Sequence, residues 1–244
     1  MKGLILAAGR GSRLEELTAD RPKGLVELRG RSLVAHQLGA LRAAGVDDIA
    51  LVRGYRGERF GFDVRYVENE RWSETGIAHS LACARDWLAG GTTIVSYADI
   101  VYEPRAVQAL VESDADLSIA YDVHWRELWE QRFEDPLSDA ETFRVDEAGW
   151  LLEIGSRAAS LDEIQGQYMG LLRFTPNGSR QLLEIYDDLE PERRDRIDMT
   201  ALLALALARG VRVRAVPFDG VWCEVDDASD LAVAEQVLRG VELP

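Results

Sequence analysis

Short apolar runs alternate with longer segments of helical periodicity through the first half of this chain, and this alternation constrains its fold most strongly. The runs have the composition of strands and lie at 3–8, 49–52, 64–67, 93–96 and 117–120. The helical segments stand between them at 33–44, 77–88 and 105–112. Strands joined by helices in this way form parallel sheets. The pattern therefore predicts an α/β fold of Rossmann-like type, with a doubly wound, mixed and mostly parallel sheet and helices on both faces.

The second half of the chain is less regular. We expect strands at 142–145, 151–154, 168–174, 211–216 and 221–224. We expect helices at 179–186, 199–209 and 230–238, with Ser229 as the N-cap of the last one. The sequence has no repeat, low-complexity tract or glycine-serine linker. These features predict one domain over residues 1–244.

Charge and composition exclude several classes of protein. The formal charge of −15 argues against nucleic acid as a partner, because binding to a phosphate backbone needs dense positive charge. Residues 1–65 nevertheless hold 12 Lys and Arg against 8 Asp and Glu, so a small polyanionic ligand would bind the N-terminal part. No apolar run reaches the roughly 20 residues of a membrane span. Cys83 and Cys223 lack the spacing of a zinc site or disulfide framework, and we expect a reduced, cytoplasmic protein.

A glycine-rich turn follows the first apolar run. Residues 6–13 read Leu-Ala-Ala-Gly-Arg-Gly-Ser-Arg, at the carboxyl end of a parallel strand, where α/β sheets bind ligands. Gly9 and Gly11 allow the backbone to approach an anion, and Arg13 adds a forked phosphate donor. The dinucleotide motif GxGxxG is excluded by Leu14, and the chain has no Gly-Lys-Ser/Thr of a P-loop. The turn therefore indicates either a phosphate site of another kind or a tight strand-to-helix connection.

Lysine is rare in this chain. Only Lys2 and Lys23 occur among its 28 basic residues, so arginine supplies nearly all positive charge. One interpretation is that a lysine stands at position 23, among so many arginines, by chance. The other is a place that needs a compact ammonium, where a forked guanidinium would not fit.

The glycine turn and Lys23 together form a longer pattern. The run 6–13, then Thr18, and then Arg-Pro-Lys-Gly-Leu-Val at 21–26 resemble LAAGxGxR…PKxL, a signature of nucleotidyltransferases that make nucleoside-diphospho compounds. The resemblance implies that the loop holds a nucleoside triphosphate and that Lys23 lies beside the reacting phosphorus. It assigns catalytic roles to Lys23 and Arg13. The implied nucleotide-binding residues in this segment are Leu6, Ala8, Gly9, Gly11, Ser12, Arg13 and Lys23.

Two distant segments supply candidate metal ligands. Asp99 follows the run 93–96, Glu224 ends the expected strand at 221–224, and Asp226 follows it. Taken singly, each is more simply a helix cap or a solvated loop residue. Both segments resemble the metal-binding stretches of the same family, which implies Mg²⁺ as cofactor, with Asp99 and Asp226 as ligands and Glu224 as a third. Asp99 is thereby placed at the nucleotide as well. Asp227 and Asp230 are interpreted as capping residues.

The segment 69–81 resembles the stretch that meets the nucleobase in choline-phosphate cytidylyltransferases and their phosphonate-specific relatives. Ser80 corresponds to a base-contacting serine, with Thr75 and Gly76 in the adjoining turn. Relatives often have asparagine at the position of Gly76. This chain therefore lacks one possible hydrogen-bond donor that those relatives have. The resemblance implies CTP as the nucleotide. His79 would either touch the nucleotide or serve a structural role.

Residues 121–141 and 165–170 are expected to bind the acceptor. Trp125 and Trp129 share one helical face, either as core or as an aromatic wall for a cation. The acid-rich segment beside Arg132 could hold a zwitterionic acceptor, with Arg132 binding its phosphoryl group and a nearby acid binding its ammonium group. The simpler account is that this segment is a solvated acidic loop. The candidate acids are Asp135, Asp139 and Glu141. The full set of predicted acceptor-binding residues is Arg132, Asp139, Glu141, Tyr168 and Trp125.

The sequence thus predicts a nucleotide-binding part at about 1–120 and an acceptor-binding part, with a small insertion, at about 121–244. The predicted reaction is transfer of CMP from CTP to a small phosphorylated or phosphonylated acceptor resembling 2-aminoethylphosphonate or phosphocholine, with release of pyrophosphate and no covalent intermediate. Two alternatives stay open: a sugar-1-phosphate nucleotidyltransferase, and a non-catalytic regulatory relative. We expect no nucleic-acid or membrane partner, and a homodimer is left open.

Overall fold

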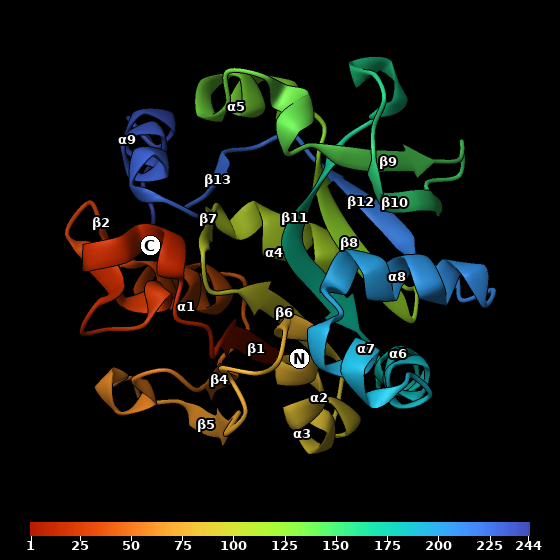
Figure 1. The fold of residues 1–244 in the computed structure, drawn as a ribbon, viewed down its shortest axis with the longest axis horizontal. Coiled ribbons are helices and arrows are strands. Elements are labelled where there is room, and N and C mark those ends of the chain that lie inside the picture. The colour runs from red at the N-terminus through yellow and green to blue at the C-terminus, as the bar shows by residue number, and fades with distance from the viewer.

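A computed structural model describes all residues 1–244 and is built around a seven-stranded sheet (Figure 1). The strand order is β12-β8-β11-β6-β1-β4-β5, and every neighbouring pair is parallel except those that β11 makes with β6 and β8. Its strands are β1 (Lys2–Ala7), β4 (Asp48–Arg53), β5 (Arg65–Glu68), β6 (Thr93–Tyr97), β8 (Leu117–Asp122), β11 (Gln167–Phe174) and β12 (Arg214–Phe218). The predicted mixed, mostly parallel sheet is confirmed, and strands from both halves of the chain share it.

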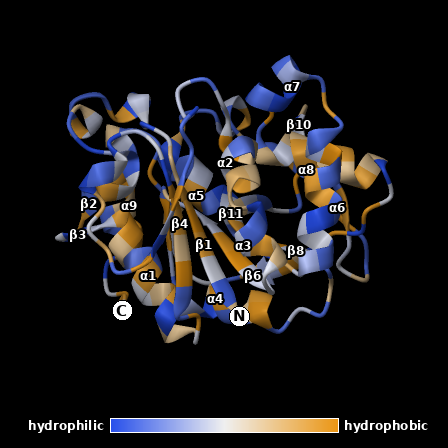
Figure 2. Cartoon of the chain, turned by 90° about the horizontal axis from the view of Figure 1, so that it is seen from below, coloured by the Kyte–Doolittle hydropathy of each residue, from blue (hydrophilic) through white to orange (hydrophobic).

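Helices cover both faces of this sheet, as predicted. The helices are α1 (Leu33–Ala43), α2 (Ile77–Cys83), α3 (Arg85–Ala89), α4 (Pro104–Val111), α5 (Trp125–Arg132), α6 (Pro176–Asp187), α7 (Pro191–Arg196), α8 (Met199–Ala208) and α9 (Ala228–Val237). One buried cluster joins a face of the sheet to α2, α3, α6 and α8, and a second joins the other face to α1, α4 and α5. Because both faces are covered, β1 and β6 are buried along nearly their whole length, with hydrophobic residues in their middle (Figure 2).

Three small sheets and five short 3-10 helices complete the chain. The sheets pair β2 (Glu27–Leu28) with β3 (Arg31–Ser32), β7 (Ile100–Tyr102) with β13 (Trp222–Glu224), and β9 (Glu141–Val145) with β10 (Leu151–Arg157). The 3-10 helices are η1 (Ser12–Thr18), η2 (Lys23–Leu25), η3 (Gly57–Arg59), η4 (Pro136–Ser138) and η5 (Leu161–Glu163). The β7–β13 pair matters most, because it joins the segment after β6 to the segment before α9.

Three details of the predicted elements were wrong. The helix expected at 77–88 is two helices, α2 and α3, separated at Ala84. The strand expected at 211–216 begins only at Arg214 and runs to Phe218. The N-cap of α9 is Asp227 and not Ser229, because the Asp227 carboxylate accepts from the backbone of the first turn while Asp230 reaches back to the backbone of the cap. None of the helices is both long and apolar enough to cross a membrane.

Candidate active site

The glycine loop leaves β1 at the carboxyl edge of the sheet and packs on Lys23. Gly11 has a φ of 72°, a left-handed conformation that favours glycine. A Cβ at this position would lie 2.6 Å from Cβ of Lys23, so the loop and the lysine are in direct contact. The hydroxyl of Thr18 closes the loop by donating to the Gly11 carbonyl at 3.0 Å. Of the loop residues predicted to bind nucleotide, Ser12 is exposed and does not line the adjacent cavity.

Lys23 lies between two carboxylates that are distant in the sequence. Its Nζ is 2.8 Å from Oδ2 of Asp99 and 2.5 Å from Oδ1 of Asp226. Burial by itself would lower the pKa of Lys23, but the two carboxylates outweigh it and raise the pKa above its ordinary value. The side chain is therefore a fixed ammonium at neutral pH. Arg13 adds a second positive charge, 3.2 Å from the other oxygen of Asp226.

Three carboxylates meet beside this ammonium. Asp99, Glu224 and Asp226 each offer an oxygen within 4.8 Å of the other two. The β7–β13 pair and a hydrogen bond from the Val225 amide to the Asp99 carbonyl, 2.9 Å long, hold the two segments together. Burial and the neighbouring charges of Asp226 and Asp99 raise the pKa of Glu224. For Asp226, burial would raise the pKa, but Lys23 reverses this effect and the pKa is lowered.

Arg132 does not face a ligand, which corrects its predicted role as an acceptor contact. Its side chain is only 1% exposed, and it pairs with Asp230 at 2.8 Å and with Glu224 at 3.0 Å. Asp230 also accepts from the backbone amide of Asp226 at 2.8 Å. The guanidinium is thus a buried counter-charge beneath the carboxylate cluster, because α9 packs against α5 and brings Asp230 to it.

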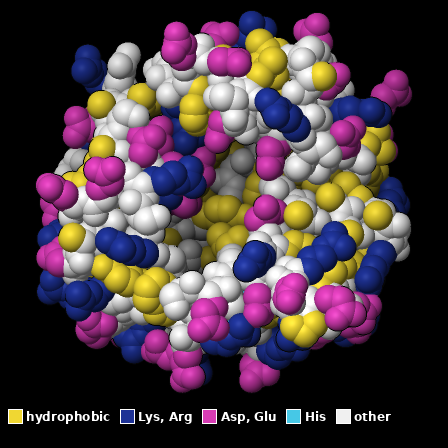
Figure 3. Space-filling model, viewed as in Figure 1, with side chains coloured by type: hydrophobic (Ala, Val, Ile, Leu, Met, Phe, Trp, Pro, Cys, Tyr) yellow, Lys and Arg dark blue, Asp and Glu magenta, His cyan; other side chains and the backbone are white.

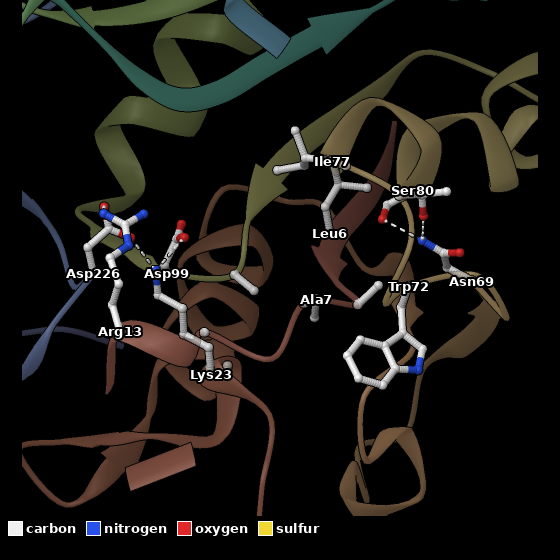
Figure 4. A pocket seen from close by; sticks show the side chains of 17 residues that line it. Leu6, Ala7, Arg13, Lys23, Asn69, Trp72, Ile77, Ser80, Asp99 and Asp226 are labelled. Carbon is white, nitrogen blue, oxygen red and sulfur yellow. Dashed lines mark hydrogen bonds and ion pairs between the residues drawn. The ribbon is translucent and has the colours of Figure 1, made fainter. Parts of the chain in front are cut away.

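A cavity of about 230 Å³ runs from this charged cluster to an uncharged polar end. In Figure 4, Arg13, Lys23, Asp99 and Asp226 lie at one end, and Asn69, Trp72 and Ser80 at the other, with Leu6 and Ile77 between them. Ala8, Gly9, Thr75 and Gly76 also line it.

The uncharged end is built on a hydrogen-bonded turn. Asn69 is buried, and its side chain bonds to the hydroxyls of both Thr75 and Ser80. Gly76 cannot be replaced without a shift, because a Cβ would lie 3.0 Å from the carbonyl oxygen of Ile197. His79 lines neither this cavity nor the neighbouring one, and its Nδ1 is 2.8 Å from the Tyr186 hydroxyl, so its role is structural.

A second cavity, of about 330 Å³, adjoins the first at Arg13 and Asp226. Figure 3 shows the molecule hollowed near the centre of this face, with hydrophobic side chains inside and charged ones around it. Carboxylates and aromatic rings line the second cavity, and these are Asp139, Glu141, Asp198, Glu224, Tyr97, Trp129, Tyr168 and Trp222. The hydroxyl of Tyr168 is buried and has no hydrogen-bond partner. Burial and the charge of Asp198 raise the pKa of Glu141.

One other predicted acceptor contact, Trp125, is wrong, and the candidate acid Asp135 lies away from both cavities. Trp125 is 5% exposed, belongs to the core cluster under α5, and lines neither cavity. Only its neighbour Trp129 reaches the second cavity, where its Nε1 donates to Asp139 at 3.2 Å. Asp135 caps η4, accepting from the Leu137 amide, and it lies outside both cavities.

Sequence analysis missed several lining residues. Asn69 and Trp72 lie inside the segment that pointed to the nucleobase, but neither was singled out. Ile77 lines both cavities and gave no chemical signal. Asp198 was overlooked as one acid among 43, although an acid that precedes a strongly apolar helix is a recognisable N-cap.

Comparisons with known proteins identify the family of this chain. Residues 3–149 match the family model of the MobA-like NTP transferase domain. The chain belongs to this family. It is therefore a nucleotidyltransferase, as its motifs predicted.

CTP:phosphoglutamine cytidylyltransferase of Campylobacter jejuni is 35% identical to this NTP transferase, over 96% of the chain and 98% of that protein. CMP-5'-(3-aminopropyl)phosphonate synthase of Streptomyces rubellomurinus is 33% identical over 49% of the chain and 20% of its own length. The inositol-1-phosphate CTP transferase of T. maritima superposes with a TM-score of 0.77 at 22% identity, covering 99% of the chain and 97% of that structure, and so shares the fold.

Proposed function

We propose that this chain is a Mg²⁺-dependent cytidylyltransferase that transfers CMP from CTP to a small phosphorylated or phosphonylated amine and releases pyrophosphate. The observation that carries the proposal is the convergence of Lys23, Arg13, Asp99 and Asp226 at one end of a cavity, where a second, acidic cavity opens. The C. jejuni and S. rubellomurinus proteins carry cytidylyl or CMP chemistry in their names, which favours CTP.

Charge decides how CTP would lie in the first cavity. Its triphosphate is a polyanion and belongs at the end that holds Lys23 and Arg13, against the glycine loop. Its base is neutral and belongs at the end lined by Thr75 and Ser80. This orientation brings the α-phosphorus close to the border with the second cavity, which Arg13 and Asp226 share.

In the proposed reaction, an oxygen of the acceptor phosphate or phosphonate attacks the α-phosphorus in line. The new bond joins that oxygen to the α-phosphorus, and the bond between the α-phosphorus and its bridging oxygen to the β-phosphate breaks. The electron pair leaves with pyrophosphate. The acceptor is already an anion, so no histidine base is needed. Lys23 and Arg13 neutralise the charge of the anions that meet here, and positioning of this kind is the main source of catalysis in phosphoryl-type transfer.

The carboxylate cluster suits Mg²⁺. Magnesium is a hard cation that takes oxygen ligands and is typically bound through one or two carboxylates together with substrate phosphates. Asp99, Glu224 and Asp226 offer such oxygens, and Oδ1 of Asp99 is buried without a hydrogen-bond partner. When bound, the ion would neutralise phosphate oxygens of the nucleotide.

The second cavity favours an acceptor with an amino group. Asp139, Glu141 and Asp198 supply negative charge, and the rings of Trp129 and Tyr168 lie among them, which is the environment that a cationic head group binds. The acceptor's anionic end would then point to Arg13 at the shared border. The acceptors named for the C. jejuni and S. rubellomurinus proteins both combine a phosphorus group with an amino group.

A substrate screen tests the proposal. Each of CTP, UTP, ATP, GTP and dTTP is incubated with Mg²⁺ and with phosphoglutamine, 3-aminopropylphosphonate, phosphocholine or glucose 1-phosphate, and pyrophosphate release is measured. We expect release with CTP and an amine acceptor. Preference for dTTP with glucose 1-phosphate would support a sugar-1-phosphate nucleotidyltransferase and contradict the proposal.

A further inference from the structure

The side chain of Asn69 makes three hydrogen bonds beneath the uncharged end of the first cavity. Its Oδ1 accepts from the backbone amide of Arg71 at 3.0 Å. Its Nδ2 donates to Oγ of Ser80 at 3.1 Å and to Oγ1 of Thr75 at 3.2 Å. The residue is only 2% exposed, so no solvent competes for these contacts.

The orientation of this amide is determined by its neighbours. A backbone N–H can only donate, so the Asn69 atom that faces Arg71 must be the oxygen. The opposite orientation would set the NH₂ group against that N–H and leave both donors unpaired. Nδ2 is therefore the atom that faces the two hydroxyls, and it can only donate to them.

This orientation determines how each hydroxyl is used. The Thr75 hydroxyl accepts from Asn69 and donates to the Arg71 carbonyl at 2.8 Å, so its proton is engaged. The Ser80 hydroxyl also accepts from Asn69, but its proton has no acceptor within the protein. Because Ser80 lines the cavity, its O–H is available to donate to a ligand there. The turn thus presents a hydrogen-bond donor to the cavity.

We infer that Asn69 is a positioning residue that selects cytosine over uracil by making Ser80 a donor; this rests on the proposed function. Cytosine has an unprotonated N3, which accepts a hydrogen bond, whereas N3 of uracil carries a hydrogen and donates. A donor at Ser80 pairs with N3 of cytosine and opposes N3–H of uracil. Leaving such groups unpaired in a buried site weakens binding by roughly tenfold or more.

A probe of the unmodified protein tests the assignment first. 3-Deaza-CTP carries a carbon in place of N3 and cannot accept there. Calorimetric titration in the presence of Mg²⁺ should show that the wild-type protein binds 3-deaza-CTP roughly tenfold more weakly than CTP. In Ser80→Ala the donor is absent, so both nucleotides should bind with similar affinity.

The Asn69→Asp variant tests the role of the amide itself. It keeps the size of the side chain and the acceptor for the Arg71 amide, but the atom facing Ser80 becomes an acceptor. The Ser80 proton then turns toward the introduced carboxylate, and a lone pair of the hydroxyl faces the base. We expect the ratio of kcat/KM for CTP to that for UTP to fall by roughly tenfold. Asn177→Asp, at the only other asparagine and exposed on α6, should leave that ratio unchanged.

The outcomes separate the two proposals. A protein that transfers CMP from CTP yet binds 3-deaza-CTP as tightly as CTP overturns the assignment of Ser80 and leaves the proposed function standing. A protein that binds neither nucleotide overturns both. Should Asn69→Asp fail to fold, the comparison of CTP with 3-deaza-CTP on the wild-type protein and on Ser80→Ala still decides the role of the Ser80 donor.

Discussion

Nζ of Lys23 lies 2.8 Å from Oδ2 of Asp99, although 76 residues separate them in the chain. Lys23 begins η2, which follows the glycine loop and η1, and Asp99 follows β6, the strand next to β1. The carboxyl ends of parallel neighbours meet at one edge of the sheet, so this topology brings the two residues together. The two side chains form an ion pair across this edge.

Loss of the ammonium at Lys23 should slow turnover strongly. In Lys23→Ala, the charge of the meeting phosphates would no longer be neutralised, and we expect kcat to fall by about 10²- to 10³-fold. Lys2→Ala is the matched control, because Lys2 is the only other lysine and packs over the ring of Trp87, outside both cavities. Steady-state kinetics with CTP measure both. Equal activity of the two variants would remove Lys23 from the catalytic machinery.

Replacing Asp99 should abolish metal binding. Asp99→Asn keeps the shape of the side chain but removes one of three converging carboxylates. We expect calorimetry to detect no binding of Mg²⁺ together with CTP at concentrations that saturate the wild-type protein. The exposed Asp86→Asn in α3 should bind as the wild type does. Unchanged binding in Asp99→Asn would reject the metal site.

Arg132 should contribute to stability through the acids that it neutralises. In Arg132→Met, Glu224 and Asp230 would lose their buried counter-charge, which costs about 3–5 kcal/mol of the free energy of unfolding. Arg126 lies on the exposed side of the same helix, and Arg126→Ala should change stability by less than about 0.5 kcal/mol. Urea unfolding followed by circular dichroism measures both. A stable Arg132→Met would mean that the guanidinium is not needed as a counter-charge.

Glu141 should act on the acceptor and not on the nucleotide. Glu141→Gln removes negative charge from the second cavity alone, so KM for an amine acceptor should rise roughly tenfold while KM for CTP stays constant. Glu134→Gln, in the same segment but exposed and outside both cavities, is the control. A rise in KM for CTP instead would place this side chain at the nucleotide.

The acceptor's KM should also depend on pH through Glu141. Burial and the charge of Asp198 raise the pKa of Glu141 above the ordinary 4.5 of a glutamate. The carboxylate is ionised above this raised pKa and becomes protonated as pH falls through it, so KM for the amine should begin to rise at a higher pH than an exposed glutamate would produce. Asp139 lines the same cavity and burial raises its pKa too, so in Glu141→Gln this part of the profile should be weaker. Identical profiles for the two proteins would contradict the assignment.

The fold could be predicted from the sequence because the composition of the strands and their alternation with helices both indicate a parallel sheet. The run at 3–8 is apolar on both faces, as buried parallel strands are, and the run at 93–96 has two β-branched apolar residues at its centre; they became β1 and β6. The error in the N-cap of α9 arose where two nearby residues could play the same local role. Ser229 and Asp227 are both good N-caps, and only the reciprocal bond of Asp230 selects Asp227.

Site residues in motifs were easier to predict than residues that act through packing. Lys23 and Asp226 stand in patterns that carry chemistry, and they lie together at the cavity. Arg132 gave the signal of a surface arginine near acids, and its burial depends on how α9 packs on α5, which the sequence does not express locally. Trp125 and Trp129 share a helical face, yet only Trp129 reaches the second cavity.

The fate of each phosphorus of CTP tests the central claim most directly. CTP labelled with ³²P at the α position, and separately at the γ position, is incubated with Mg²⁺ and an amine acceptor, and the products are separated. We predict that the α label is recovered on the acceptor and the γ label in pyrophosphate. Recovery of the γ label on the acceptor, or no transfer of the α label, would contradict nucleotidyl transfer at this site.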